Sequence, residues 1–207
     1  MDLGREGRVA LVTGSTRGIG RAIATRLAAE GARVVVNGRD PELVAQVVAA
    51  LPGDAWGIAA DVTTVAGCAA IAEALAEREG RLGVLVCNVG SGASVPPGQE
   101  TSDEWRRMLD LNLMSAAHMV QATRPLLATA GGAALCISSI CGVAALGCPV
   151  AYAAAKAALN AYVRNMARPL AADGIRLNAL APGNILFDAD DEPYIADSVH
   201  DLLRHEF

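Results

Sequence analysis

The chain alternates short runs of β-branched residues with longer segments of helical pattern, and this alternation constrains its fold more than any other feature. The pattern predicts strands over residues 8–13, 33–37, 55–61, 82–87, 133–138 and 175–182. It predicts helices over residues 18–31, 40–53, 64–79, 102–130 and 150–172. Six strands separated by helices indicate an α/β protein, with a parallel, doubly wound sheet as the middle of three α/β/α layers.

Residues at the predicted helix ends support this division. Asp40 is expected to cap the second helix, with Pro41 at its first position and Pro52-Gly53 as its stop. Ser102 is expected to cap the long helix that follows. No repeat, linker or low-complexity tract divides the chain, so residues 1–207 are expected to form a single domain.

Composition and charge exclude several classes of function. Hydrophobic residues make up 53% of the chain but aromatic residues only 3%, so the core must consist of Ala, Val, Leu and Ile. The net charge of −5 leaves no basic face for the phosphates of a nucleic acid. Residues 125–155 carry no charge, but Ser, Gly and Pro interrupt their apolar runs. A spanning helix needs roughly 20 apolar residues, so a membrane span is rejected.

The cysteines and the N-terminus indicate a cytoplasmic protein. The five cysteines form an odd set without a CxxC pair, and several lie in apolar runs, where Cys behaves as a small hydrophobe. They are expected to be reduced thiols, and no Cys/His cluster suggests a metal site. The first residues of the chain lack the long apolar segment of a signal peptide.

A glycine-rich loop, TGSTRGIG, follows the first predicted strand and opens the first predicted helix. Glycines there allow a tight turn, and the amides at the helix N-terminus face the ligand, which suits the pyrophosphate of a dinucleotide. The alternative is a plain turn between strand and helix. In the Rossmann-type interpretation, the cofactor-binding residues of this loop are Gly14, Ser15, Arg17, Gly18, Ile19 and Gly20.

The residues after the second strand predict which dinucleotide binds. An acidic side chain there would hold a free ribose 2′-OH, but the chain reads Asn37-Gly38-Arg39, and Asp40 is assigned to helix capping. Arg39 and Arg17 are instead available to clamp a 2′-phosphate, unless both are ordinary surface charges. NADP(H) is therefore expected rather than NAD(H).

Tyr152 and Lys156 enclose three alanines in the sequence YAAAK, within an otherwise uncharged stretch. One interpretation is a packed aromatic followed by a solubilising surface lysine. The other is that the two side chains, one helical turn apart, face one cleft in which the ammonium favours the phenolate form. The spacing alone does not decide between them.

Together these motifs resemble the short-chain dehydrogenase/reductase family over about residues 7–186. The glycine spacing and the YxxxK motif have the family's form, and Ser139 precedes Tyr152 by thirteen residues, as the family's catalytic serine does. The resemblance implies that Tyr152 exchanges a proton as hydride moves and that Ser139 holds the substrate oxygen. It also implies that Lys156 contacts the nicotinamide ribose, and that Asn112 supports a water chain to Lys156.

The resemblance adds further cofactor-binding residues. Asp61-Val62 matches the family's pair that contacts the adenine. The family's usual NNAG reads CNVG here, over residues 87–90, so Asn88 and Gly90 match and the other two positions depart. A later segment is similar to the one that closes over the nicotinamide, through Pro182, Gly183 and Ile185.

The end of the chain departs from the resemblance. Residues 187–207 are acidic and show no strand pattern where the family usually continues to a seventh strand, so six strands and an atypical tail are expected. In the family, the helices that correspond to residues 102–130 and 150–172 pair across a two-fold axis. Because small residues permit close helix approach, a homodimer through these helices is expected.

The leading function is therefore an NADP(H)-dependent carbonyl reductase or alcohol dehydrogenase with a small-molecule substrate. The alternative is a catalytically silent dinucleotide-binding sensor or partner subunit. Resembling enzymes that reduce carrier-bound ketoacyl groups dock the acidic carrier on basic residues before the fifth and sixth strands, and this chain lacks them. A small apolar or alicyclic carbonyl compound is favoured as substrate.

Overall fold

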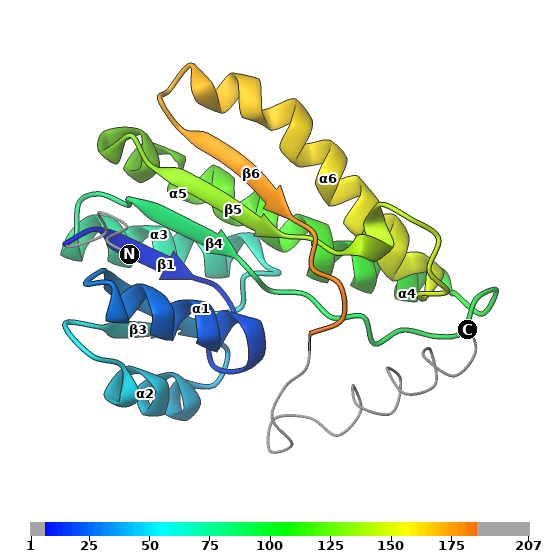
Figure 1. The fold of residues 1–207 in the computed structure, drawn as a ribbon, viewed down its shortest axis with the longest axis horizontal. Coiled ribbons are helices and arrows are strands. Elements are labelled where there is room, and N and C mark those ends of the chain that lie inside the picture. The colour runs from blue at the N-terminus through cyan, green and yellow to red at the C-terminus, as the bar shows by residue number, and fades with distance from the viewer. Residues whose placement is uncertain (1–6, 186–207) are drawn as a thin grey trace.

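The computed structural model describes residues 7–185, in which six parallel strands form one sheet with helices on both faces (Figure 1). The strand order is β3-β2-β1-β4-β5-β6. The bounds of the strands are β1 Val9–Val12, β2 Arg33–Gly38, β3 Trp56–Ala59, β4 Val84–Cys87, β5 Ala133–Ile137 and β6 Arg176–Leu180. The Rossmann-type, doubly wound α/β fold predicted from the sequence is confirmed, and its strands lie within two residues of the predicted ends.

The helices follow the predicted order, with one interruption. Their bounds are α1 Gly18–Ala29, α2 Pro41–Ala50, α3 Val65–Arg78, α4 Ser102–Leu109, α5 Ser115–Ala130 and α6 Val150–Ala171. A π-helical segment, η1 (Asp110–Met114), joins α4 to α5, and a short 3₁₀ turn, η2 (Ile140–Gly142), follows β5. The predicted tail, residues 187–207, lies outside the described residues. Between residues 7 and 185, no helix is both long and apolar enough to cross a bilayer.

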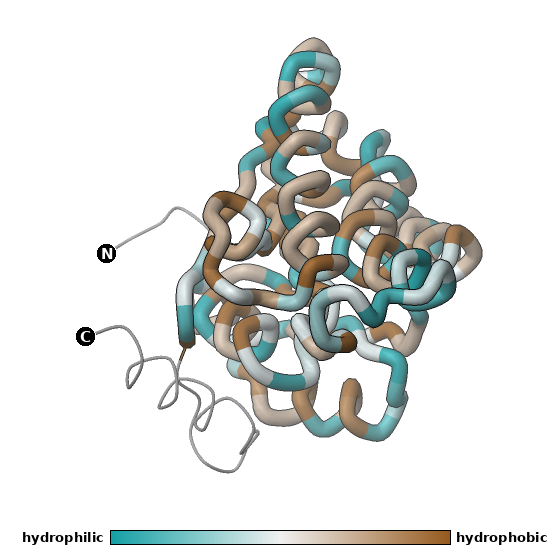
Figure 2. The backbone as a smooth tube through the Cα atoms, turned by 90° about the vertical axis from the view of Figure 1, so that its right-hand side faces the viewer, coloured by the Kyte–Doolittle hydropathy of each residue, from teal (hydrophilic) through white to brown (hydrophobic). Residues whose placement is uncertain are grey.

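The core consists of two layers, one on each face of the sheet. α1 and α2 pack small apolar residues such as Ala24 and Val44 on one face, while α3, α5 and α6 cover the other. All residues of β1 are buried, as expected for a central strand covered on both faces. Figure 2 shows hydrophilic and hydrophobic residues mixed along the helices, as in helices with one face on a sheet and the other in solvent.

The capping predictions are correct for α2 and wrong for α4. Asp40 accepts hydrogen bonds from the amides of Glu42 and Leu43, as predicted. At α4 the cap is Thr101, whose hydroxyl accepts a hydrogen bond from the Glu104 amide at 3.1 Å. Ser102 is instead the first helical residue. Two adjacent hydroxyl residues offered two possible caps, and the helix begins after the first.

The predicted continuous helix 102–130 contains a π-helical segment centred on Asn112. No proline or glycine lies in this segment, so the sequence pattern gave no sign of the change in winding. Segments of this kind are rare and frequent at functional sites. Asn112, at the centre of this segment, has a buried side chain, and this side chain forms part of the site described below.

In α/β proteins with this strand order, the ligand crevice lies at the carboxyl ends of β1 and β4. These strands are neighbours although α1, α2 and α3 separate them in the sequence. The connections that follow them leave the sheet in opposite directions, and α/β proteins bind ligands at such a reversal. The glycine loop follows β1, and residues 88–101 follow β4, so both lie at this crevice.

Candidate active site

The glycine loop turns between β1 and α1 through Gly14 and Gly18, which have φ angles of 61° and 53°. A Cβ added at Gly20, in the first turn of α1, would lie 2.4 Å from both the Gly14 carbonyl oxygen and Asn88 Nδ2. Only glycine allows the helix to approach the loop this closely. Arg17 at the N-cap makes no side-chain cap bond, and the first turn holds no acidic residue, so the helix N-terminus suits an anion. The loop therefore fits a pyrophosphate.

Ser15, another predicted residue of the loop, faces inward. The buried Ser15 hydroxyl donates to the Val12 carbonyl at 2.7 Å and accepts from the Asn37 amide at 3.0 Å. The Ser15 amide donates to the Asn37 carbonyl at 2.8 Å. Both polar groups are used within the fold, so Ser15 positions the loop. Ile19 is half-buried in α1.

Thr13 and Asn37, which the predicted set did not include, hold the loop to the neighbouring strands. The Asn88 amide donates to Thr13 Oγ1 at 2.9 Å, and the Asn88 side chain donates to the carbonyls of Thr13 and Gly14. Asn37 Nδ2 donates to two carbonyls at the end of β3, and its Oδ1 accepts from the Gly14 amide at 3.4 Å. The sequence signal that could have identified Thr13 and Asn37 is their position, since each is a polar residue at the end of a buried apolar strand.

A side chain at Gly38, at the end of β2, would require Thr16 to move. A Cβ added at Gly38 would lie 2.6 Å from Thr16 Cγ2. Arg39 is exposed directly after it. The Asp61 carboxylate accepts from the Thr63 amide at 2.9 Å and from its hydroxyl at 2.8 Å. The pKa of Asp61 is lowered, mainly by the hydrogen bond from the Thr63 amide and to a smaller extent by the positive charge of Arg39.

Tyr152 and Lys156 lie together at the start of α6. Lys156 is only 3% exposed, and its Nζ lies 6.0 Å from the centroid of the Tyr152 ring. That Nζ donates to the carbonyl oxygen of Ile137 at 2.8 Å. Burial lowers the pKa of Lys156 to about 8. The interpretation of Lys156 as a solubilising surface residue is therefore wrong.

Asn112 meets Lys156 at the backbone of Gly90. A Cβ added at Gly90 would lie 2.8 Å from Asn112 Oδ1 and 3.0 Å from Lys156 Nζ, so only glycine fits between them. Asn112 also binds Ser91 at both backbone groups: Oδ1 accepts from the amide at 3.0 Å, and Nδ2 donates to the carbonyl at 3.1 Å. The segment after β4 is thus hydrogen-bonded to Asn112 and lies against Lys156.

Ser139 lies between β5 and η2 and is 8% exposed. Its Oγ accepts from the Cys141 amide at 3.1 Å, which fixes the hydroxyl where the strand ends. A disulfide joins Cys141 to Cys148 across the loop between Ser139 and Tyr152. The loop brings the two Cα atoms to 6.1 Å, within disulfide reach.

The expectation of five reduced thiols is therefore wrong for this pair. The three other cysteines are free and buried: Cys68, Cys87 and Cys136. The cysteines as a set no longer support the expected cytoplasmic location. No group of three possible metal-ligating side chains occurs within residues 7–185.

The segment after β6 lies against η2. The Ile140 amide donates to the Pro182 carbonyl at 3.0 Å, and a Cβ at Gly183 would lie 3.6 Å from Ile140 Cδ1. Ile185, the last described residue, is 41% exposed. Val62 differs from these residues, because its side chain is buried in the core together with residues of α3, α5 and α6.

Comparison with known proteins places the chain in a family. It matches the family described as short chain dehydrogenase over residues 8–193. It is 37% identical over 185 residues to the rhamnolipids biosynthesis 3-oxoacyl-[acyl-carrier-protein] reductase of Pseudomonas aeruginosa, covering 86% of this chain and 72% of that protein. It is 38% identical over 186 residues to a tropinone reductase homolog of Arabidopsis thaliana, covering 85% and 69%.

Solved structures agree with this placement. The Pseudomonas aeruginosa RhlG/NADP active-site complex is similar with a TM-score of 0.86 and 34% identity, over 94% of this chain and 81% of that one. A 7α-hydroxysteroid dehydrogenase complexed with NADH and 7-oxo glycochenodeoxycholic acid has a TM-score of 0.85 and 33% identity, over 94% and 78%. The chain belongs to the short-chain dehydrogenases, as its motifs predicted. It is an NAD(P)-dependent oxidoreductase of that family.

Proposed function

We propose that this oxidoreductase prefers NADP(H) and transfers hydride between that dinucleotide and a carbonyl compound or secondary alcohol. The observation that carries the proposal is the buried ammonium of Lys156, 6.0 Å from the Tyr152 ring. Burying a lysine is costly because its charged form loses hydration. A fold that places one beside a phenol, at the edge of a ligand crevice, favours proton transfer at that phenol.

We propose for these residues the roles that the family resemblance implies. In the direction of reduction, a dinucleotide held at the glycine loop would supply the hydride that the carbonyl carbon accepts. Tyr152 donates its phenolic proton to the carbonyl oxygen, and the Ser139 hydroxyl holds that oxygen in place. The charge of Lys156 stabilises the phenolate that remains. Asn112, fixed against Gly90, supports the water chain that returns a proton to this end of the site.

The preference for NADP(H) yields the first prediction. We expect NADPH to bind about 10- to 100-fold more tightly than NADH, since each charge-assisted contact to a phosphate contributes about 1.5–3 kcal/mol. Arg39→Asp should reverse the preference by placing an acid near the 2′ position. Fluorescence titration with both dinucleotides measures the ratio of the two affinities.

Arg168→Asp is the control for this prediction. It makes the same charge change at an exposed position near the end of α6, away from the crevice, and should leave the affinity ratio unaltered. Equal affinities in the wild type would contradict the assignment.

The substrate proposed is a small apolar or alicyclic carbonyl compound. Three large apolar side chains between Ser139 and Tyr152 are exposed: Val143 at 73%, Leu146 at 42% and Val150, the first residue of α6, at 43%. Similar proteins are named for carrier-bound, tropinone-type and steroid substrates, so the family alone does not choose among these classes. The exposed apolar side chains of this segment favour a substrate with little charge.

NADPH oxidation over a panel of carbonyl compounds tests the function as a whole. We expect turnover with apolar cyclic or aromatic ketones and little with charged ones. Cofactor titration on the same preparation separates the two hypotheses. A protein that binds NADPH but reduces no compound would support the alternative, a silent dinucleotide-binding sensor or partner subunit.

We further propose that the chain works as one dinucleotide-binding domain and pairs as a homodimer through α4, α5 and α6. Nine small or apolar residues of these helices motivated the prediction, and five of them are used in the core of the chain itself: Ala116, Met119, Val120, Leu159 and Val163. The residues left for an interface are Ala117, Ala154, Ala158 and Ala161. Light scattering at micromolar concentration should give twice the 21.2 kDa chain mass. A monomer would refute the helix pairing, and a tetramer would require a second interface.

A further inference from the structure

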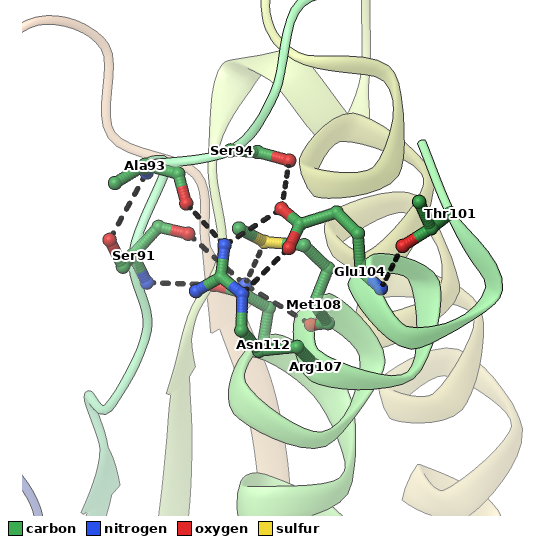
Figure 3. A network of polar contacts seen from close by, with 8 residues as sticks. All are labelled: Ser91, Ala93, Ser94, Thr101, Glu104, Arg107, Met108 and Asn112. Carbon is green, nitrogen blue, oxygen red and sulfur yellow. Dashed lines mark hydrogen bonds and ion pairs between the residues drawn. The ribbon is translucent and has the colours of Figure 1, made fainter. Parts of the chain in front are cut away.

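The segment after β4 is held from outside the site by a polar clamp (Figure 3), which we define as Ser94, Glu104 and Arg107 with the carbonyl of Ala93. The Glu104 carboxylate accepts two hydrogen bonds from Arg107, at 2.7 and 2.8 Å, and one from the Ser94 hydroxyl at 2.6 Å. Arg107 also donates to the Ala93 carbonyl at 2.8 Å. The clamp therefore joins α4 to two successive residues of the segment.

Both side chains of the clamp's ion pair, Glu104 and Arg107, are charged at neutral pH. Hydrogen bonds from Arg107 and Ser94 lower the pKa of Glu104 to about 2. The Glu104 side chain is 12% exposed, whereas the Arg107 side chain is 49% exposed. A bidentate arginine–carboxylate pair fixes direction as well as distance. The backbone of Glu104 is also fixed, because its amide donates a hydrogen bond to the hydroxyl of Thr101, the N-cap of α4.

On its inner side the same segment contacts the proposed catalytic residues. Gly90 lies against Asn112 and Lys156, and Ser91 is bound by Asn112 at both backbone groups. A Cβ added at Gly92 would lie 3.7 Å from the Tyr152 ring, so this residue forms part of the wall beside the phenol. The segment has no regular secondary structure of its own to fix it. Its position is set by Asn112 on one side and the clamp on the other.

We propose that Glu104 and Arg107 are positioning residues, which hold residues 91–94 as the wall of the substrate site beside Tyr152. The inference rests on the proposed function, since it assigns these residues to the binding of a carbonyl substrate. They do not touch the reacting atoms. Without the clamp, the wall moves away from Tyr152, and the substrate is held less well for proton transfer.

α4 provides a matched control for the clamp. Arg106 and Asp103 form an ion pair with the same three-residue spacing on the same helix, at 2.7 Å. Their side chains are 72% and 91% exposed, so this pair lies in solvent. Replacing Arg106 removes the same charge and a similar contribution to helix stability as replacing Arg107. A difference between the two positions therefore reports on the segment and not on the helix.

Steady-state kinetics with the clamp variants test the proposal. We expect Arg107→Met and Glu104→Gln each to lower kcat/KM about 10- to 100-fold, mainly through KM, because small misplacements at a site have effects of this size. The double variant should be no worse than either single one, since both break one network. Arg107→Lys should recover part of the loss. Arg106→Met and Asp103→Asn should stay within about twofold, and NADPH affinity should be unchanged in all of them.

Amide hydrogen exchange gives a readout that does not depend on turnover. Amides of residues 91–94 should exchange faster in Arg107→Met and Glu104→Gln than in the wild type, and at the wild-type rate in Arg106→Met. Ser94→Ala removes one contact of the clamp without altering α4. If the helix variants no longer bind NADPH, the exchange and kinetics of Ser94→Ala test the proposal in their place. Unchanged exchange and kinetics in all clamp variants, or equal losses in the Arg106 control, would overturn the proposal. If the wild-type protein shows no turnover but residues 91–94 still exchange faster in the clamp variants than in the wild type, the proposed function is refuted and the clamp is retained.

Discussion

Replacing Tyr152 with Phe is expected to lower turnover about 10²- to 10⁴-fold, the range associated with a positioned general acid. The substitution removes only the phenolic hydroxyl. The ring keeps its place beside Gly92 and the Lys156 side chain, so the shape of the crevice is preserved. NADPH affinity should therefore stay within about twofold of the wild type, because the hydroxyl contributes little to a site held by the glycine loop. Single-turnover NADPH oxidation and a binding titration measure the two effects separately.

Tyr162→Phe is the matched control for this prediction. Tyr162 lies on the same helix and packs against the apolar core, where burial raises its pKa. Losing that hydroxyl should alter turnover by less than about twofold, since it lies away from the crevice. Retention of turnover in Tyr152→Phe, or an equal loss in Tyr162→Phe, would remove Tyr152 from the proposed chemistry.

The fold could be predicted because its strands carry an unambiguous pattern. Val9–Val12 and Val34–Val36 are continuous apolar runs, and such runs form the buried strands of a parallel sheet. Local details depended on geometry that residue types do not determine. Thr101 and Ser102 are equivalent as caps until the helix start is known, and the π-helical winding around Asn112 leaves no mark in the sequence.

The candidate site could be predicted only where chemistry depends on fixed spacing. Tyr152 and Lys156 lie one helical turn apart, so their meeting follows from the helix itself. The clamp could not be predicted in the same way, since Glu104 and Arg107 read as ordinary charges on an exposed helix. Their contacts to Ala93 and Ser94 depend on the path of an irregular segment. The disulfide was missed for the same reason.

The second large effect is expected from Lys156→Met. Turnover should fall about 10²-fold or more, because the phenolate of Tyr152 loses the charge that stabilises it. NADPH affinity should fall about 10- to 100-fold if Lys156 also binds the ribose, since charge-assisted hydrogen bonds contribute about 1.5–3 kcal/mol. This joint loss separates Lys156 from Tyr152, whose replacement should affect turnover alone. Normal NADPH binding by the variant would exclude the ribose contact.

Lys156 should also make the stability of the cofactor-free protein depend on pH. Burial lowers its pKa to about 8 from an ordinary value of 10.5. Between these values the unfolded chain keeps the proton while the folded protein releases it, so stability rises as pH increases through this window. From about pH 7 to about pH 9.5 the gain is about 2 kcal/mol, at about 1.4 kcal/mol for each pH unit above the folded pKa. The difference in urea unfolding between the wild type and Lys156→Met should show this gain, because the buried thiols of Cys68 and Cys87, whose pKa values are raised, lower the stability of both proteins alike as the pH rises.

Lys156 is the single lysine of the chain, so its titration can be observed directly. In protein grown with isotope-labelled lysine, one side-chain NMR signal should titrate near pH 8 in the free protein. Binding of NADPH should move this transition upward, because the cofactor adds negative charge and hydrogen-bond acceptors near the ammonium. A transition near 10.5 in the free protein would mean that the ammonium is fully hydrated, and the stability gain between pH 7 and pH 9.5 would then have to be absent as well.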